Sequence, residues 1–145
     1  MKKVILLGLF LLSFALQAQE TEAKAAIVSF FEGFHAKDTL KMKMYCHDKM
    51  VLQSISEGAK GTKLTEEKAT AFFTSMTQIP ATMKFEERLL GFEIKIDGSM
   101  AHVWTPYEFY INGTLSHVGV NAFTLILENN QWKIVHLIDT RRKKK

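Results

Sequence analysis

Polar side chains inside an apolar stretch near the C-terminal end are the first candidates for chemistry. His117 and Asn121 lie there with Gly119 between them, which leaves room for another group to approach. A neutral imidazole in such a place can act as general base, general acid or hydrogen-bond donor. The alternative is a structural histidine that bonds a neighbouring carbonyl or lies on an exposed sheet face.

Strand alternation assigns these residues to faces. One face carries His117, Gly119, Asn121 and Phe123, and the other carries the more apolar set of Ser116, Val118, Val120 and Ala122. In the last apolar run, one face carries Lys133, Val135, Leu137, Asp139 and Arg141, and the other carries Trp132, Ile134, His136, Ile138 and Thr140.

Asp139 is the second catalytic candidate. A carboxylate beside a histidine fixes its tautomer and raises its basicity, so His117 and Asp139 would form an acid–base pair if the strand register brings them together. The alternative is a salt bridge from Asp139 to Arg141 or Arg142, which contributes little if it is exposed. The sequence leaves both arrangements open.

Four residues are candidates for ligand binding: His35, Trp104, Tyr107 and Asn121. Aromatic rings can line a pocket, and a tyrosine hydroxyl can donate to a bound carbonyl, although such residues are also common in cores. His35 flanks the apolar stripe of the first predicted helix. It could instead be a helix-end histidine favoured by the helix dipole, with Asp38 capping the next helix.

Cys46 is the only cysteine, so an intramolecular disulfide is impossible. Its neighbour His47 would point about 100° away on a helix, which argues against a thiol–imidazole pair. No Cys/His spacing of a structural zinc site is present. We therefore predict neither a metal nor a cofactor.

The N-terminal half has the periodicity of helices. Residues 20–37 predict a helix with one apolar stripe, made of Ile27, Phe30, Phe31 and Phe34. Asp38 can cap a short second helix in which Leu40 and Met44 share a face. A short strand over 51–55 and a loop marked by Gly58 and Gly61 follow.

A third helix is predicted to begin at Thr65, a good N-cap residue. Glu66 and Glu67 suit its first turn, and Pro80 marks its exit. Its apolar stripe would consist of Ala69, Phe72, Phe73 and Met76.

The C-terminal half has the composition of strands and three tight-turn signals. The signals are Asp97-Gly98, Asn112-Gly113 and Asn129-Asn130. The runs between them are 85–96, 100–111, 114–128 and 131–140. Consecutive hairpins predict an antiparallel meander, and apolar residues on both parities predict strong curvature.

This order of elements resembles the nuclear transport factor 2-like superfamily, with its polyketide-cyclase-like (SnoaL-like) and ketosteroid-isomerase-like branches. Three stretches carry the resemblance: IVSFFEGFHAKDT over 27–39, AHVWTPYEFYINGTLSHVGVNAF over 101–123 and QWKIVHLIDTRR over 131–142. The resemblance implies an α+β, cone-shaped fold in which N-terminal helices pack on a strongly curved antiparallel meander sheet around a pocket. It also implies dimerisation through the sheet. The isomerase pattern of an Asp base with a Tyr and a protonated Asp cannot be mapped here.

The N-terminus has the order of a secretory signal: Lys2 and Lys3, an apolar run over 4–12, then small residues before Gln19. The run is shorter than the about 20 residues that span a bilayer, which argues against the alternative of an uncleaved anchor. We predict a signal peptide over 1–18, a domain over 19–140, a basic tail over 141–145, and a periplasmic or secreted location.

The formal charge of +4 is a property of the ends of the chain. Loss of Lys2 and Lys3 leaves +2, and setting aside the five basic residues at 141–145 leaves −3. A nucleic-acid binder spreads positive charge over a surface, so we predict no nucleic-acid partner and no stable membrane anchor.

Together these observations predict an exported homodimer that binds a small, largely apolar molecule inside the cone. The first alternative is a small lyase, isomerase or hydrolase that uses His117 and Asp139 in general acid–base chemistry. The second is a protein-interaction scaffold that uses the outer sheet face.

Overall fold

The computed structural model describes the backbone of residues 2–144 and the side chains of residues 17–144. It contains three helices: α1 (Lys2–Ala36), α2 (Thr39–Met44) and α3 (Ala69–Gln78). Its strands are β1 (Cys46–Gly58), β2 (Gly61–Lys68), β3 (Phe85–Leu89), β4 (Glu93–Asp97), β5 (Met100–Ile111), β6 (Thr114–Glu128) and β7 (Gln131–Arg141).

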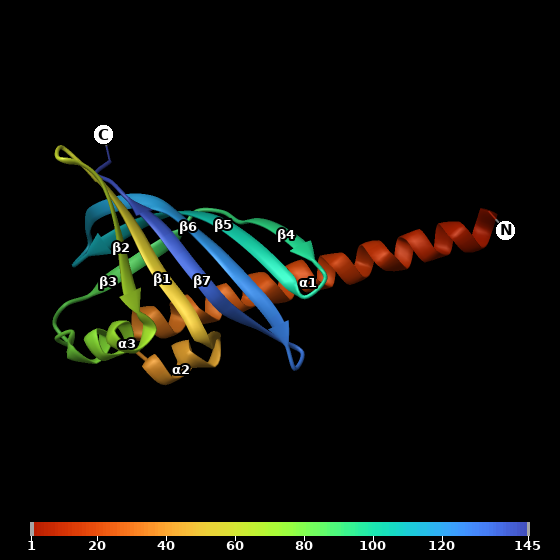
Figure 1. Cartoon of the computed structure of the whole chain (residues 1–145), viewed down its shortest axis with the longest axis horizontal. Helices are drawn as coiled ribbons and strands as arrows, with labels where there is room; N and C mark the ends of the chain where they lie inside the picture. The colour runs from red at the N-terminus through yellow and green to blue at the C-terminus, as the bar shows by residue number, and fades with distance from the viewer. Residues whose placement is uncertain (1, 145) are drawn as a thin grey trace.

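The strands form one curved sheet in the order β2-β1-β7-β6-β5-β3, with β4 also paired to β5 (Figure 1). The predicted meander holds for β4 to β7, where every pairing is antiparallel. The prediction of a wholly antiparallel sheet is wrong, because β1 pairs with β7 in parallel. After the β1–β2 hairpin, α3 carries the chain to the opposite edge of the sheet, where β3 lies.

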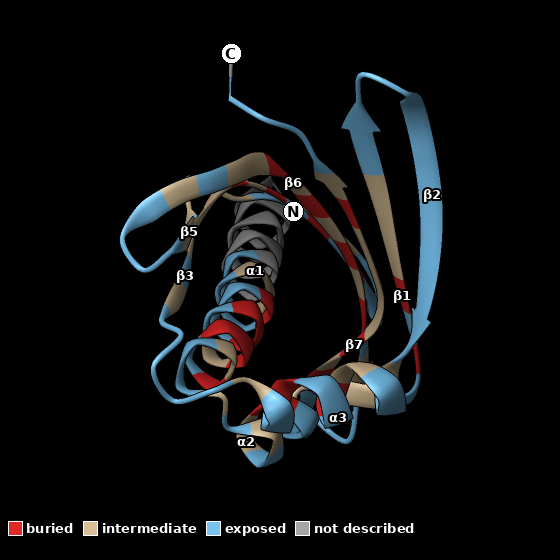
Figure 2. Ribbon diagram, turned by 90° about the vertical axis from the view of Figure 1, so that its left-hand side faces the viewer, coloured by how far each residue is buried: buried red, intermediate tan, exposed pale blue. Residues whose placement is uncertain are grey.

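The core lies between α1 and the concave face of the sheet, while α2 and α3 lie at one end of this space (Figure 2). The predicted stripe of α1 is confirmed: Ile27, Phe30 and Phe31 are buried, and Phe34 packs against the same core. On the sheet side, the Phe123 ring meets the Phe31 ring edge-on at a centroid distance of 6.1 Å. Aromatic packing of this kind adds to the free energy of burial.

α2 is capped as predicted, because an Asp38 side-chain oxygen accepts a hydrogen bond of 3.0 Å from the Lys41 amide. The shared face of Leu40 and Met44 is exposed, and Met42 is the buried residue of this helix. The short cap therefore positions Met42 against the core.

The prediction that a helix begins at Thr65 is wrong. Thr65 lies in β2, opposite Ser54 of β1, and α3 begins only at Ala69. Because β2 is wholly exposed on an edge, its sequence lacks the apolar alternation that would identify a strand. β1 is longer than predicted because it pairs on both sides, with β2 and with β7.

The run 85–96 is two strands rather than one. β3 pairs with residues 107–111 of β5, and β4 pairs with residues 100–104 of the same strand. Pro106 lies between these positions and has no backbone N–H to donate, so the edge pairing is interrupted there. Its carbonyl still accepts a bond of 2.8 Å from the Leu90 amide.

Two of the three turn predictions are confirmed by positive φ at both central residues, in Asn112-Gly113 and Asn129-Asn130. At the third turn, Asp97 pairs with Met100, and Gly98 alone has a positive φ, so the central residues are shifted by one.

The face assignment of the last strand changes at Val135. The β6–β7 register slips here, since Leu125 pairs with Ile134 while Thr124 pairs with His136. Val135 is therefore an extra residue, and such a bulge reverses the alternation. Trp132 and Ile134 are buried, in contrast to the prediction that they share a face with His136.

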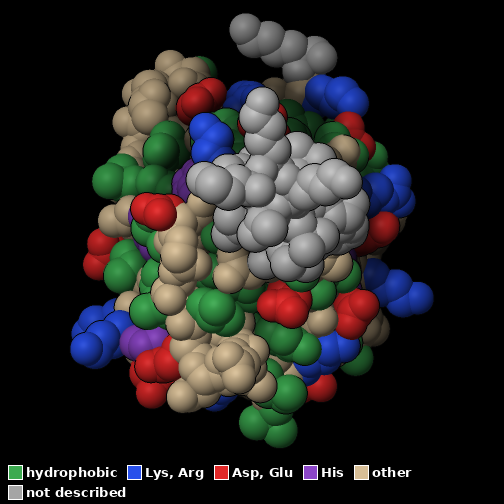
Figure 3. Space-filling model, turned by 90° about the vertical axis from the view of Figure 1, so that its right-hand side faces the viewer, with side chains coloured by type: hydrophobic (Ala, Val, Ile, Leu, Met, Phe, Trp, Pro, Cys, Tyr) green, Lys and Arg blue, Asp and Glu red, His purple; other side chains and the backbone are tan. Residues whose placement is uncertain are grey.

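The predicted signal peptide lies mostly outside the residues whose side chains are described, and its cleavage stays a prediction. None of the helices in the described part of the chain combines the length and apolar character that crossing a membrane requires. At the end of the molecule from which α1 emerges, Lys and Arg side chains are interspersed with Asp and Glu (Figure 3).

The predicted basic tail is not free along its described length. Arg141 ends β7 opposite Ser56, Arg142 bridges to Val118, and Lys144 forms an ion pair of 2.8 Å with Glu108. The chain thus returns over β6 and β5 after β7.

Candidate functional site

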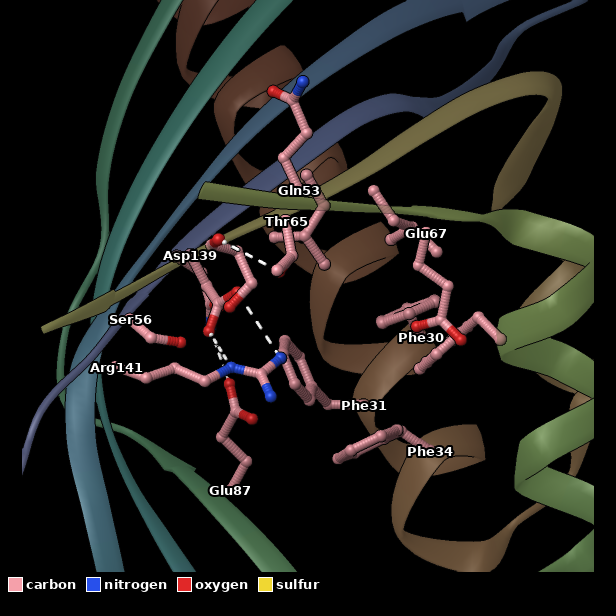
Figure 4. A pocket seen from close by; sticks show the side chains of 15 residues that line it. Phe30, Phe31, Phe34, Gln53, Ser56, Thr65, Glu67, Glu87, Asp139 and Arg141 are labelled. Atoms are coloured by element: carbon pink, nitrogen blue, oxygen red, sulfur yellow. Dashed lines mark hydrogen bonds and ion pairs between the residues drawn. The ribbon is translucent and has the colours of Figure 1, made fainter. Parts of the chain in front are cut away.

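A cavity of about 210 Å³ lies between α1, α3 and the concave face of the sheet (Figure 4). Its helical side is aromatic, formed by Phe30, Phe31, Phe34 and Phe72. Its sheet side is mostly polar, with Leu52 and Leu137 as the apolar exceptions, and is formed by residues of β1, β2, β3, β6 and β7. A larger but shallower hollow lies between α1 and the β6–β7 turn, around Trp132.

The polar side of the cavity follows the register of the sheet. Thr105 pairs with Asn121, Asn121 with Asp139, and Asp139 with Ser54. We call these four residues the polar row. Thr105, Asn121 and Asp139 are 0%, 3% and 7% exposed and are the buried polar residues of the described chain. Burying polar groups is costly unless they are satisfied, so their collection in one row is a strong constraint.

Asp139 is the centre of the hydrogen bonds at this end of the cavity. Its Oδ2 accepts 3.0 Å from the Tyr107 hydroxyl and 2.7 Å from Arg141 Nε. The Tyr107 hydroxyl also lies 2.9 Å from the Thr140 carbonyl oxygen. Burial and the negative charges of Asp139 and Glu87 raise the pKa of Tyr107, which therefore stays protonated and serves as a donor.

Glu87 of β3 completes the polar side of the cavity. Its Oε1 accepts a hydrogen bond of 2.6 Å from Asn121 Nδ2. Burial is the main reason that the pKa of Glu87 rises to about 7; the Asn121 hydrogen bond opposes this rise, and the charge of Asp139 adds to it. Besides the exposed Glu67, the site thus contains two carboxyl groups in different states, one paired with Arg141 and one near half-protonation at neutral pH.

Gly119 allows β6, β5 and β7 to come together at this end of the cavity. A Cβ atom at this position would lie 1.7 Å from the Thr140 carbonyl oxygen and 2.9 Å from the Tyr107 ring. Gly119 does leave room for another group, as predicted, but the Thr140 carbonyl and the Tyr107 ring of the same chain fill that room.

His117 lies outside the lining of this cavity. Its ring stacks on Phe109 at a centroid distance of 4.8 Å, and its Nδ1 is 3.1 Å from Ser116 Oγ. Burial and the charge of Arg141 lower the pKa of His117, so the neutral form predominates at pH 7. Among the described contacts none joins His117 to Asp139, and the salt bridge from Asp139 to Arg141 is the arrangement observed.

The ligand-binding candidates divide between the two faces of the sheet. Asn121 lines the cavity, and Tyr107 supports it through Asp139. Trp104 is 43% exposed and lies on the outer face, with the parity opposite to that of buried Thr105. His35 does not line the cavity, but its Nε2 accepts 2.9 Å from the Glu87 amide and so fixes β3.

Of the predicted site residues only Asn121 and Asp139 line the cavity, and the polar lining residues not predicted include Ser54, Glu67, Glu87 and Arg141. Glu87 lies between Phe85 and Leu89, with the inward parity of a short strand, and this was the available signal. Arg141 is two residues after Asp139 and therefore on its face, but it was assigned to the tail.

Cys46 has no nucleophilic character in this setting. Burial raises its pKa to about 12, and its Sγ donates a hydrogen bond of 3.3 Å to the Met42 carbonyl. Across the part of the chain with described side chains, no group of three or more His, Cys, Asp or Glu residues is arranged to hold a metal ion.

No family model matches the sequence, and no curated protein matches it either. Solved structures are similar in fold. An NTF2-like protein of unknown function from Shewanella baltica OS155 superposes with a TM-score of 0.61 and 13% identity, over 88% of this chain and 96% of the other. A proposed dehydratase of the NTF2-like family from Streptomyces avermitilis gives a TM-score of 0.67 and 12% identity, over 88% and 99%.

The beta subunit of a proposed aromatic-ring-hydroxylating dioxygenase from Novosphingobium aromaticivorans is also similar, with a TM-score of 0.71 and 8% identity over 90% of this chain and 94% of the other. At these identities the similarity concerns the fold alone. The chain has the α+β nuclear transport factor 2-like fold, in which N-terminal helices pack on a mixed, mostly antiparallel sheet. The predicted fold class is confirmed, and the branch of the superfamily stays a prediction.

Proposed function

We propose that this protein binds a small, largely apolar molecule in the cavity between α1, α3 and the sheet. The observation that carries the proposal is the division of the cavity wall. Four phenylalanines form the helical side, and most of the sheet side is polar, with Ser54, Asn121, Asp139 and Glu87 beside Leu52 and Leu137. Ligand sites in proteins commonly combine an apolar wall with a few placed polar groups.

Ser54 supports the same proposal. Its hydroxyl oxygen is buried without a hydrogen-bond partner among the described residues, and Ser54 lines the cavity. A buried polar atom without a partner is costly, and rotation of the Ser54 side chain toward the cavity would let a bound molecule or an ordered water relieve that cost. The volume of about 210 Å³ suits one or two rings, because a cavity of about 150 Å³ holds benzene.

The test is direct binding of naphthalenemethanol, a neutral fluorescent probe, measured by calorimetry and by fluorescence. Ser54→Leu places a larger side chain in the cavity and should abolish binding. The matched control is Ser116→Leu. Ser116 is exposed, has the parity of β6 opposite to that of Asn121, and lies outside the cavity. Equal loss in both variants, or binding unaffected by Ser54→Leu, would contradict the proposal.

A second candidate function is acid–base catalysis, and the state of the carboxyl groups favours it. Glu87, with a pKa of about 7, and Asp139, paired with Arg141, line one cavity. Such a pair can supply a proton donor and a proton acceptor at neutral pH. The catalytic pair His117 and Asp139 remains the rival within this class.

The two catalytic assignments predict different pH–activity profiles. If Glu87 is the acid, Glu87→Gln removes the limb near pH 7 while His117→Ala leaves it in place. If His117 acts with Asp139, the reverse result is expected.

We also propose that the protein is exported and forms a homodimer through its outer sheet face. The apolar run at 4–12 supports export.

The interface is supported by exposed apolar side chains on the outer face of β5 and β6, those of Trp104, Met100 and Ile126. N-terminal sequencing of secreted protein tests the first point, and native mass spectrometry of wild type and Trp104→Glu tests the second. Binding of a different protein to this face is the alternative outcome.

A further inference from the structure

The ionisable groups around the cavity are unequal in sign. Three carboxyl groups line it, those of Glu67, Glu87 and Asp139, against the single cation Arg141. Arg141 is already paired with Asp139 at 2.7 Å. Neither Glu67 nor Glu87 forms a salt bridge with any described residue, so the cavity has an excess of negative charge whenever these groups are ionised.

Glu87 is the group that a ligand would meet inside the cavity. Its Oε1 is bound by Asn121, whereas Oε2 has no hydrogen-bond partner among the described residues. Figure 4 shows the Glu87 side chain near Arg141, across the cavity from the rings of Phe31 and Phe34. A carboxyl group with one oxygen unpaired among the described residues thus lies opposite an aromatic wall.

We propose that the ligand is an amphipathic amine, whose ammonium group pairs with Glu87 and whose apolar body lies against the phenylalanines of α1. This inference rests on the proposed binding function and specifies its ligand class. An ammonium group supplies the counter-ion that Glu87 lacks, and aromatic faces attract cations at close range.

The opposite charge type fits the cavity less well. A carboxylate ligand would have to pair with the Nη groups of Arg141, whose charge is already partly neutralised by Asp139, and would approach Glu67 and Glu87 as a like charge. Like charges brought together without solvent raise the free energy of the complex.

Proton uptake by Glu87 makes binding of an amine depend on pH. The titratable groups that interact with Glu87 are His35 on α1, Tyr107 on β5, and Asp139 and Arg141 on β7, and Glu67 on β2 lines the same cavity. Around a pKa of about 7, the ionised fraction of Glu87 rises from about a tenth at pH 6 to about nine tenths at pH 8. Primary alkylamines stay protonated over this range. Amine affinity should therefore rise about tenfold between pH 6 and pH 8.

The experiment compares three probes with the same ring system, substituted at the same carbon: naphthylmethylamine, naphthalenemethanol and naphthoate. Calorimetric titrations at pH 8 use the wild type, Glu87→Gln, and Glu86→Gln as the matched control. Glu86 is the neighbouring residue, is exposed, and pairs with Arg88 outside the cavity. The wild type and Glu86→Gln should bind the amine about tenfold more tightly than the alcohol, and Glu87→Gln should bind both equally.

The outcomes separate this inference from the proposed function. Equal affinity of the wild type for amine and alcohol, or preference for naphthoate, overturns the amine proposal but leaves binding in the cavity intact. Failure of all three probes to bind overturns both. If Glu87→Gln does not fold, the wild type alone decides, because amine affinity that does not rise between pH 6 and pH 8 contradicts the role of Glu87.

Discussion

Two neighbouring rows on the concave face of the sheet differ completely in chemistry. The polar row is Thr105, Asn121, Asp139 and Ser54, and the row two residues away along each strand, the apolar row, is Val103, Phe123, Leu137 and Leu52. Both rows cross β5, β6, β7 and β1 on the same face. The first borders the cavity with three of its four residues. The second packs in the core, and its members Leu52 and Leu137 also reach the cavity wall.

The difference shows that an inward position on a strand has two uses in this fold. Phe123 packs beneath α1 against Phe31, whereas the side-chain amide of Asn121, two residues earlier, donates a hydrogen bond to Glu87. The apolar row stabilises the fold by burial, and the polar row is costly to bury and is retained where a cavity lies. Substitutions in the two rows should therefore have separable effects.

The largest effect is expected at Gly119, beside the polar row. In Gly119→Ala the new Cβ would lie 1.7 Å from the Thr140 carbonyl oxygen, so β6 and β7 must separate. We expect a loss of about 4 kcal/mol or more in the free energy of unfolding, measured by chemical denaturation. The control is Gly91→Ala, where a Cβ meets nothing within 4 Å and the change should stay within about 0.5 kcal/mol. Similar stabilities of the two variants would contradict the close approach.

The apolar row should dominate stability without controlling Glu87. Phe123→Ala removes a fully buried ring and should cost about 3–4 kcal/mol in the free energy of unfolding. Asn121→Ala should cost about 1–2 kcal/mol and should also raise the pKa of Glu87, because the hydrogen bond from Asn121 holds that pKa down. An NMR titration of the Glu87 side chain in the two variants checks this contrast. A larger shift of the Glu87 pKa in Phe123→Ala than in Asn121→Ala would contradict it.

Glu87→Gln should stabilise the protein at pH 8. The folded chain holds the Glu87 proton up to about pH 7, whereas the unfolded chain releases it near pH 4.5, so stability falls between these values as pH rises. The neutral glutamine avoids this loss, which amounts to about 3 kcal/mol above pH 7. Thermal unfolding at pH 4 and pH 8 measures it, with Glu86→Gln as control. If Glu87→Gln were less stable than the wild type at pH 8, burial of the ionised Glu87 carboxylate would not be destabilising.

The smallest effect is expected for Asp139→Asn. The substitution keeps a partner for the Tyr107 hydroxyl but removes the charge that pairs with Arg141, whose side chain is 54% exposed. Since solvent screens a half-exposed cation, we expect a loss of only about 1–2 kcal/mol in the free energy of unfolding. The pKa of Glu87 should fall in this variant, because the charge of Asp139 raises it. An unchanged pKa of Glu87 in Asp139→Asn would show that the charge of Asp139 does not act on Glu87.

Much of this fold was predictable because its signals are local. The stripe of α1, the Asp38 cap and the turns at Asn112-Gly113 and Asn129-Asn130 depend on residues close in sequence. The sharing of a face by Asp139 and Arg141 was also predicted, since no bulge lies between them.

The site was predictable only in part because it depends on pairings between distant strands. Nothing local places Ser54 beside Asp139, because parallel pairing of β1 with β7 joins segments far apart in the chain. The parity that Glu87 shares with Phe85 and Leu89 distinguishes it from Glu86, but the parity alone does not show that it meets Asn121 of β6. The bulge at Val135 reversed the faces of Trp132 and Ile134 for the same reason, since register is decided by the partner strand.

An NMR titration of the ¹⁵N-labelled protein with naphthalenemethanol is the most direct test of the central claim, that the cavity beside the polar row is a ligand site. We predict saturable amide shifts at Ser54, Asn121 and Asp139, with smaller shifts at Phe123 in the apolar row and none at outer-face Trp104. Shifts confined to the outer face, or none that saturate, would contradict the claim.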